Sequence, residues 1–257
     1  MYKRQPLILV SNDDGISATG IRALIDVVRE IGDVVVVAPD GPQSGMGHAI
    51  TLSSTLRCDQ IHIDDGPQIE YECSGTPVDC VKLAVSTILE RKPDLCVSGI
   101  NHGSNSSINV IYSGTMSAAV EGALEGIPSI GFSLLDYSHD ADFSASKRVV
   151  KTIVEKVLKE GLPKGRCLNV NIPKLSYSDI KGYKICRQAD ANWVEDFDKR
   201  KDPTGRTYYW LTGSFQNFDK GNDTDEWALA NGYVSVVPVQ YDITAYDCIS
   251  ELNSWGL

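Results

Sequence analysis

The sequence predicts an α/β fold in which a mostly parallel sheet carries helices on both faces. Apolar runs alternate with helix-like segments through the first half of the chain, which is typical of parallel strands covered on both sides. A length of 257 residues suits one large domain, because single cores stop growing near ~250 to 300 residues. Between residues 190 and 222 the composition becomes polar and aromatic, which suggests an exposed hairpin, with a mobile surface loop as the alternative.

The elements of the N-terminal half follow from where apolar runs stop and helix caps begin. Short runs rich in β-branched residues are expected as strands, and longer amphipathic segments between them as helices. Thr76 can cap one helix, with Pro77 in its first position and Asp79 three residues after the cap, and Gly126 closes another. In chain order we expect a strand at 6–11, a helix at 19–31, strands at 33–39, 55–63 and 68–73, a helix at 77–91, a strand at 93–101, a helix at 114–126 and a strand at 127–134.

The C-terminal half is less regular, and it contains no internal repeat and no low-complexity tract. Its composition changes most clearly at the hairpin segment. The expected order is a helix at 142–160, a strand at 167–173, the apolar segment 183–188, the hairpin at 190–222, a short helix at 224–232, a strand at 233–239 and a terminal helix at 244–255.

Charge and composition exclude several classes of protein. A net charge of -10 would repel a nucleic-acid backbone, so no nucleic-acid groove is expected. No stretch approaches the ~18 to 20 apolar residues of a membrane span, and the first apolar run is too short for a signal peptide, so we expect a cytoplasmic protein. Seven cysteines without a C-x-x-C pair are typical of reduced core thiols, and the four histidines lack zinc-binding spacing.

Two adjacent carboxylates, Asp13 and Asp14, directly follow the first apolar strand. They repel each other, and burial adds to the penalty, so a neutralising cation is expected. Ligands of a parallel sheet bind beyond the carboxyl ends of its strands. Ser44 and Asn101 also follow predicted strands, and the loops at this edge contain no lysine or arginine. Two carboxylates, a hydroxyl and an amide oxygen suit Mg²⁺ or Mn²⁺, so the sequence predicts a metal site at this edge.

A phosphate site is expected beside this metal site. Ser113, Gly114 and Thr115 lie at a predicted helix start, where unpaired backbone N–H groups and the helix dipole attract an anion. A metal ion next to bound phosphate polarises its oxygens and activates a water molecule, so the pair of sites indicates metal-assisted hydrolysis of a phosphoester.

Each motif also has a purely structural interpretation. Taken alone, NDDG is a good turn, the segment around Ser44 a flexible loop, SGINHGSN a polar loop, and YSGT a helix cap. His48 and His102 are interpreted as loop or supporting residues. The placement of all four motifs at one edge of the sheet favours a functional site.

Taken together, the motifs resemble those of the survival protein E (SurE) family of metal-dependent 5'-nucleotidases. The resemblance implies a Rossmann-like core, phosphatase activity on nucleoside monophosphates, and a C-terminal extension used in assembly. It leaves open 3'-nucleotidase and exopolyphosphatase activities. The matching motifs lie within residues 11–21, 38–45, 75–81, 98–105, 112–122, 169–173 and 232–244.

The resemblance also assigns roles to individual residues. It implies one domain over 1–257, with the core and active site in 1–135, the fold completed by 136–257, and a hairpin at 190–222 that joins subunits into a homodimer or homotetramer. Two positions depart from the family pattern: Ser117 stands where glycine is common, and His48 lies in a variable loop. The implied ligands of one Mg²⁺ or Mn²⁺ per subunit are Asp13, Asp14, Ser44 and Asn101, the phosphate site is Asn105, Ser113, Gly114 and Thr115, and the catalytic residues are Asp13, Asp14 and Asn105.

Other functions fit the sequence less well. An aspartyl-phosphate phosphatase usually has its two aspartates in a D-x-D pattern, whereas here they are contiguous. A metal-dependent deacetylase needs a histidine near the paired aspartates, and a dinucleotide dehydrogenase needs G-x-G-x-x-G after the first strand; both are missing. A non-catalytic, metal-dependent nucleotide-binding or sensor module remains open as the alternative.

Overall fold

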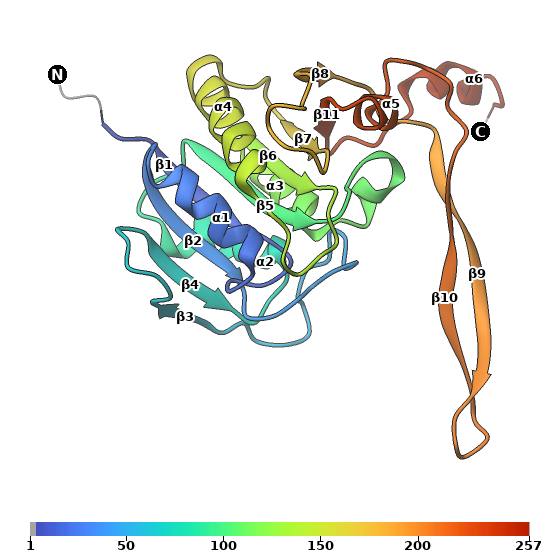
Figure 1. The fold of residues 1–257 in the computed structure, drawn as a ribbon, viewed down its shortest axis with the longest axis horizontal. Helices are drawn as coiled ribbons and strands as arrows, with labels where there is room; N and C mark the ends of the chain where they lie inside the picture. The colour runs from blue at the N-terminus through green and yellow to red at the C-terminus, as the bar shows by residue number, and fades with distance from the viewer. Residues whose placement is uncertain (1–3, 257) are drawn as a thin grey trace.

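The computed structural model describes residues 4–256, which form a nine-stranded sheet, flanking helices and a long projecting hairpin (Figure 1). The strands are β1 Leu7–Ser11, β2 Asp33–Pro39, β3 Cys58–Ile61, β4 Ile69–Cys73, β5 Leu95–His102, β6 Ser129–Leu134, β7 Arg166–Ile172, β8 Tyr183–Ile185, β9 Ala191–Lys201, β10 Thr207–Asn217 and β11 Val234–Gln240. The helices are α1 Thr19–Val28, α2 Pro77–Leu83, α3 Gly114–Leu124, α4 Ser144–Glu160, α5 Asp225–Ala230 and α6 Ile249–Asn253.

Most neighbouring strands of the sheet are parallel. The order is β3-β4-β2-β1-β5-β6-β7-β11-β8, and the six strands from β4 to β7 all run in the same direction. β3 is antiparallel to β4 at one edge, and β11 is antiparallel to β7 near the other. The predicted α/β class with a mostly parallel sheet is therefore confirmed, and the loops after β1, β2 and β5 leave the sheet at one end.

Helices cover both faces of the sheet, as predicted. α1 and α4 pack side by side on one face, where Ile21, Leu24 and Val149 join the largest cluster of buried apolar side chains (Figure 1). α2 and α3 cover the other face, with Val81 and Ala118 in a second buried cluster. Burial on both faces explains why the central strands are continuous apolar runs.

Several predicted boundaries are wrong. The helix expected at 77–91 has the predicted capping box between Thr76 and Asp79, but α2 ends at Leu83 and a π-helical turn follows over Ala84–Ile88. That turn contains β-branched residues, which are crowded against the preceding turn of a helix. A short 3₁₀ helix, Ser107–Ile111, forms where only a loop is expected, and the terminal helix is reduced to α6 after a 3₁₀ turn at Tyr246–Cys248.

The predicted hairpin is present as β9 and β10, which project from the domain as a two-stranded ribbon (Figure 1). Its strands pair without interruption from Ala191↔Asn217 to Lys201↔Thr207. At its tip, the carboxylate of Asp202 accepts hydrogen bonds from the backbone N–H groups of Thr204 and Arg206.

No helix within residues 4–256 has the length and apolar character needed to span a membrane.

Candidate active site

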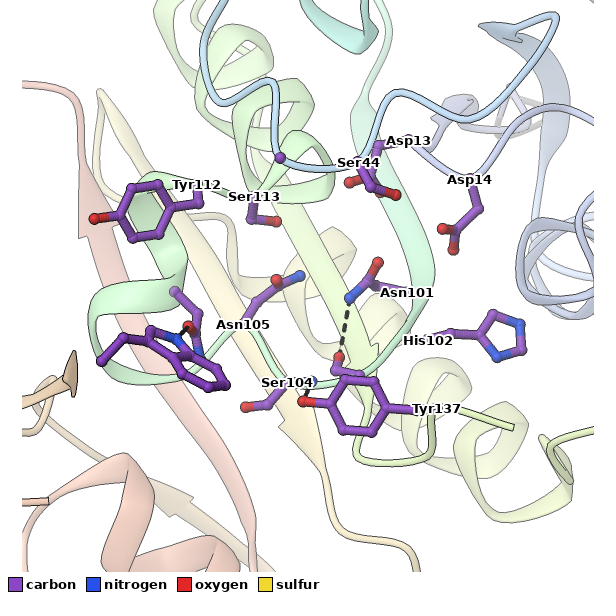
Figure 2. Close-up of a pocket in the computed structure, with 14 residues that line it drawn as sticks. Asp13, Asp14, Ser44, Asn101, His102, Ser104, Asn105, Tyr112, Ser113 and Tyr137 are labelled. Atoms are coloured by element: carbon purple, nitrogen blue, oxygen red, sulfur yellow. Dashed lines mark hydrogen bonds between the residues drawn. The ribbon is translucent and has the colours of Figure 1, made fainter. Parts of the chain in front are cut away.

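A cavity of about 260 Å³ opens at the carboxyl ends of β1 and β5, where ligands of parallel sheets bind (Figure 2). Six of the eight predicted site residues line it. They come from the loops after β1 and β2, from the end of β5 and the loop after it, and from the N-cap of α3: Asp13, Asp14, Ser44, Asn101, Asn105 and Ser113. The remaining two, Gly114 and Thr115, lie in the first turn of α3, directly behind Asp13.

Asp13 is the most deeply buried acid of the cavity, with 4% of its surface exposed. Burial raises its pKa to about 6, because a desolvated carboxylate resists ionisation; the hydroxyl of Thr115 opposes this shift, and the negative charge of Asp14 adds to it. The Thr115 Oγ1 donates a hydrogen bond of 2.5 Å to Asp13 Oδ1, across 102 residues of sequence. The backbone C=O of Asp13 accepts from the N–H of Gln43 at 2.7 Å, which draws the Ser44 loop toward the site.

Asp14 is half-buried and lies on the same side of the cavity as His102 (Figure 2). Burial raises the pKa of Asp14, and the neighbouring His102 opposes the shift. The His102 ring is itself held by a 3.1 Å hydrogen bond between its Nε2 and Thr19 Oγ1, and by an edge-on contact with Phe143 at 5.1 Å between ring centroids. His102 therefore lines the cavity, with its ring held by Thr19 and Phe143.

The amide of Asn101 presents its oxygen to the acidic end of the cavity. Its Nδ2 donates to the backbone C=O of Gly103 at 2.9 Å, which fixes the orientation of the amide. The Oδ1 then points toward Asp13 and Ser44 (Figure 2). Three loops thus place four oxygen-bearing side chains together.

Asn105 is fixed by three hydrogen bonds that the sequence did not reveal. Its N–H donates to Asn171 Oδ1 at 2.8 Å, its C=O accepts from Asn169 Nδ2 at 2.7 Å, and its own Nδ2 donates to Ser133 Oγ at 2.7 Å. Asn169 and Asn171 lie two residues apart on β7, so both side chains face the same side of the sheet. Both asparagines belong to the strand expected at 167–173, and their alternation along it is the sequence signal that could identify these supports.

The first turn of α3 contacts the acidic end of the site closely. Ser113 caps the helix by accepting from the backbone N–H of Met116 at 3.0 Å. At Gly114 an added Cβ would lie 2.5 Å from the Cβ of Asp13, so a side chain is excluded there. Gly114 and Thr115 therefore pack against Asp13, while their N–H groups belong to the unpaired first turn of the helix.

These residues fit a hard divalent cation. Two carboxylates are held in partly or fully buried positions, and none of the residues lining this cavity is a lysine or arginine that could neutralise them. Across residues 4–256 there is no cluster of three or more His, Cys, Asp and Glu side chains suited to a metal, so a zinc-type centre is not found in that range. Carboxylate, hydroxyl and amide oxygens are the donors that Mg²⁺ and Mn²⁺ prefer.

Sequence reasoning missed the aromatic part of the cavity. Tyr112, Tyr137 and Trp193 line it together with Asn109 and Ser104. The Tyr137 hydroxyl accepts a 3.4 Å hydrogen bond from the N–H of Ser104. Aromatic side chains scattered over three segments give no local motif, so only the folded chain identifies them as neighbours.

Comparison with known proteins agrees with this geometry. The family model described as Survival protein SurE matches residues 8–195, which contain all eight predicted site residues. The chain belongs to the SurE family.

Its SurE relatives cover the whole chain. The 5'-nucleotidase SurE of Christiangramia forsetii is 67% identical over 258 residues, spanning 100% of this chain and 99% of that protein. The 5'-nucleotidase SurE of Flavobacterium psychrophilum is 67% identical over 253 residues, spanning 98% of each. The crystal structure of the SurE protein from Aquifex aeolicus superposes with a TM-score of 0.85 at 42% identity, covering 98% of this chain and 100% of that chain.

Ser117 and His48, the two positions expected to depart from the SurE pattern, lie outside the cavity lining. Ser117 is buried in α3, where its Oγ donates to the backbone C=O of Ser113 at 2.7 Å. His48 bonds the buried carboxylate of Glu121 through Nε2 at 2.9 Å, and Lys82 bonds the same carboxylate at 2.6 Å. Ser117 therefore bonds the main chain of Ser113, the N-cap of α3.

Proposed function

We propose that the chain is a divalent-metal-dependent 5'-nucleotidase that hydrolyses nucleoside 5'-monophosphates to nucleoside and inorganic phosphate. The observation that carries this proposal is the meeting of two desolvated carboxylates, a free amide oxygen and a helix N-terminus in one cavity. Full-length identity of 67% to proteins named 5'-nucleotidase SurE supports the same conclusion.

In this proposal Asp13, Asp14, Ser44 and Asn101 hold one Mg²⁺ or Mn²⁺ per subunit. A bound ion would polarise the phosphoryl oxygens and lower the pKa of a water molecule. The protein's part is to keep the ligands in place before the ion arrives: Thr115 orients Asp13, and the bond to Gly103 orients the amide of Asn101.

The phosphate is held by Asn105, Ser113 and the start of α3. One hydrogen of Asn105 Nδ2 is used by Ser133, which leaves the other to donate to a phosphoryl oxygen. Ser113 Oγ accepts from Met116, so its own proton is available as a donor. The N–H groups of Gly114 and Thr115 supply the positive end of the helix dipole. With Asp13 and Asp14, Asn105 forms the catalytic set.

Release of phosphate tests the function directly. Purified protein with AMP or GMP should release inorganic phosphate with Mg²⁺ or Mn²⁺ and release none with excess EDTA, and added Mn²⁺ should restore it. Nucleotide binding without turnover under every metal condition would favour a metal-dependent sensor instead. Adding 3'-AMP and tripolyphosphate to the panel tests the 3'-nucleotidase and exopolyphosphatase activities that we include in the proposal.

We also propose that residues 1–257 act as one domain and assemble into a homodimer or homotetramer through the C-terminal extension. One continuous sheet takes strands from both 1–135 and 136–257, which supports the single domain. An isolated two-stranded ribbon is marginally stable in water, yet this one exposes Phe197, Tyr209 and Trp210. Light scattering that finds a stable monomer at assay concentrations would contradict the assembly.

The cysteines support the proposed cytoplasmic location. All seven are unpaired, and five of them are buried. Unpaired buried thiols are typical of a reducing compartment.

A further inference from the structure

Aromatic side chains surround the outer part of the cavity, away from the two aspartates. Tyr112 follows the 3₁₀ helix, Tyr137 follows β6, and Trp193 lies near the start of the hairpin strand β9. Figure 2 shows Tyr112 and Tyr137 on different sides of the opening. A volume of about 260 Å³ lies below the ~300 to 1,000 Å³ of pockets that enclose whole drug-sized ligands. A nucleotide held at its phosphate near the aspartates would therefore extend to the aromatic rings, which line the same cavity.

Trp193 is the aromatic residue whose ring is held in place most firmly. Its Nε1–H donates to Asn109 Oδ1 at 2.8 Å, and its edge meets Phe215 with 5.6 Å between ring centroids and 65° between ring planes. Trp193 and Phe215 are also paired residues of β9 and β10. Tyr137, by contrast, is 74% exposed and makes one long hydrogen bond. An indole that is already fixed loses little side-chain entropy when a ligand stacks on it.

Stacking is a means of recognising the rest of a nucleotide that the aromatic part of this cavity offers. No lysine or arginine is among the lining residues, and the aromatic rings share this part of the cavity with the side chains of Asn109 and Ser104. A nucleobase offers a flat π-face, and stacking on an aromatic side chain contributes about 1–3 kcal/mol per base in nucleic-acid-binding proteins.

We propose that Trp193 stacks on the nucleobase, so that the hairpin supplies one wall of the substrate site in addition to its proposed part in assembly. This inference rests on the proposed nucleotidase function and adds to it a residue that selects for the base. A purine covers more of the indole than a pyrimidine does, so Trp193 favours AMP and GMP over UMP.

The test compares substrates with and without a base. Trp193→Ala should raise the KM for AMP and GMP on the order of tenfold, raise that for UMP less, and change the KM for ribose 5-phosphate less than twofold. Trp193→Phe, which keeps a stacking face, should restore most of the affinity. An equal rise for ribose 5-phosphate, or an unchanged KM for AMP, would overturn the proposal.

Trp210→Ala is the matched control on the same hairpin. Trp210 lies on β10, is 59% exposed and does not line the cavity. Light scattering on both variants measures how far each has lost assembly. If loss of assembly raised the KM for AMP, Trp210→Ala would raise that KM as much as Trp193→Ala does when both variants lose assembly equally. A base-selective change in Trp193→Ala alone supports stacking.

A binding measurement keeps this inference separate from the nucleotidase proposal. Adenosine, which carries no phosphate, should quench the tryptophan fluorescence of the wild type, and the quenched fraction should disappear in Trp193→Phe. If wild-type protein released no phosphate from any nucleotide, the proposed function would fail while the adenosine result still decided the role of Trp193. Undiminished quenching in Trp193→Phe would refute that role.

Discussion

Replacing Gly114 with alanine tests how closely the first turn of α3 supports the candidate metal site. The new methyl group would lie 2.5 Å from the Cβ of Asp13 and 2.9 Å from its Oδ2, whereas ordinary contacts lie at 3.4–4 Å. Asp13 or the helix must therefore move by about 1 Å. Overpacking of this kind costs about 1–3 kcal/mol, and because Gly114 is the first residue of α3, the helix-interior preference for alanine does not offset it.

The expected result is a folded protein with little activity. A destabilisation of about 1–3 kcal/mol lowers the Tm of a chain of this size by less than about 12 °C. Displacing a reactive group by about 1 Å costs on the order of a hundredfold in rate, so kcat/KM for AMP with Mn²⁺ should fall by about that factor.

Phosphate release measures this loss, and thermal unfolding with and without Mn²⁺ reports whether the metal still binds. Gly41→Ala is the matched control, because nothing lies within 4 Å of the methyl group it would add in the loop after β2. We expect Gly41→Ala to keep wild-type activity. Wild-type kcat/KM in Gly114→Ala would refute the packing argument.

Three other substitutions test neighbouring interactions. Thr115→Val removes the hydrogen bond to Asp13 and should lower kcat/KM about tenfold. Thr115→Ser keeps a hydroxyl and should recover the activity, so equal rates in the two variants would contradict this. Asp13→Asn should abolish turnover without lowering the Tm in EDTA at pH 7. The pKa of Asp13 is raised from 3.8 to about 6, so at pH 7 its ionised carboxylate destabilises the fold by on the order of 3 kcal/mol. A large fall in Tm would point to a structural role. Glu70→Gln removes the negative charge that Arg22 bonds, but Asp64 still bonds Arg22, so the loss should be about 1–3 kcal/mol at pH 7. Burial opposes ionisation of Glu70, but its bonds to Arg22 hold its pKa below 4.5. The stability that the ionised carboxylate adds is therefore present above pH 4.5 and lost as the pH falls. Unfolding curves of the wild type and Glu70→Gln that do not converge in acid would refute this.

The sequence was sufficient to predict the edge of the sheet where the site lies. Asp13 and Asn101 each follow or end an apolar run, and parallel strands bring their carboxyl ends together whatever their order in the sheet. That rule depends on local pattern and on one general property of the fold. It therefore placed Ser44 and Ser113 in the same cavity although they are far apart in the chain.

Contacts between distant segments were beyond the reach of sequence patterns. The bond between Thr115 and Asp13 and the support of Asn105 by Asn169 and Asn171 depend on register between elements that are 64 to 102 residues apart. A helix start predicts exposed N–H groups, but it does not say which side chain packs behind them. The place of Trp193 likewise depends on where the hairpin leaves the domain, which no local motif specifies.

The packing of α3 links the two halves of the candidate site. Thr115 orients Asp13 with its hydroxyl, and its backbone N–H belongs to the helix start that would receive the phosphate. A movement of this turn would therefore change the proposed metal ligand and the proposed anion site together. No lysine or arginine is among the lining residues. The negative substrate and the buried carboxylates would therefore depend on the same cation for neutralisation, which strengthens the coupling between the proposed metal ligand and the proposed phosphate site. Substitutions at Thr115 should consequently raise both the Mn²⁺ concentration needed for activity and the KM for AMP, whereas substitutions at Trp193 should change only the second.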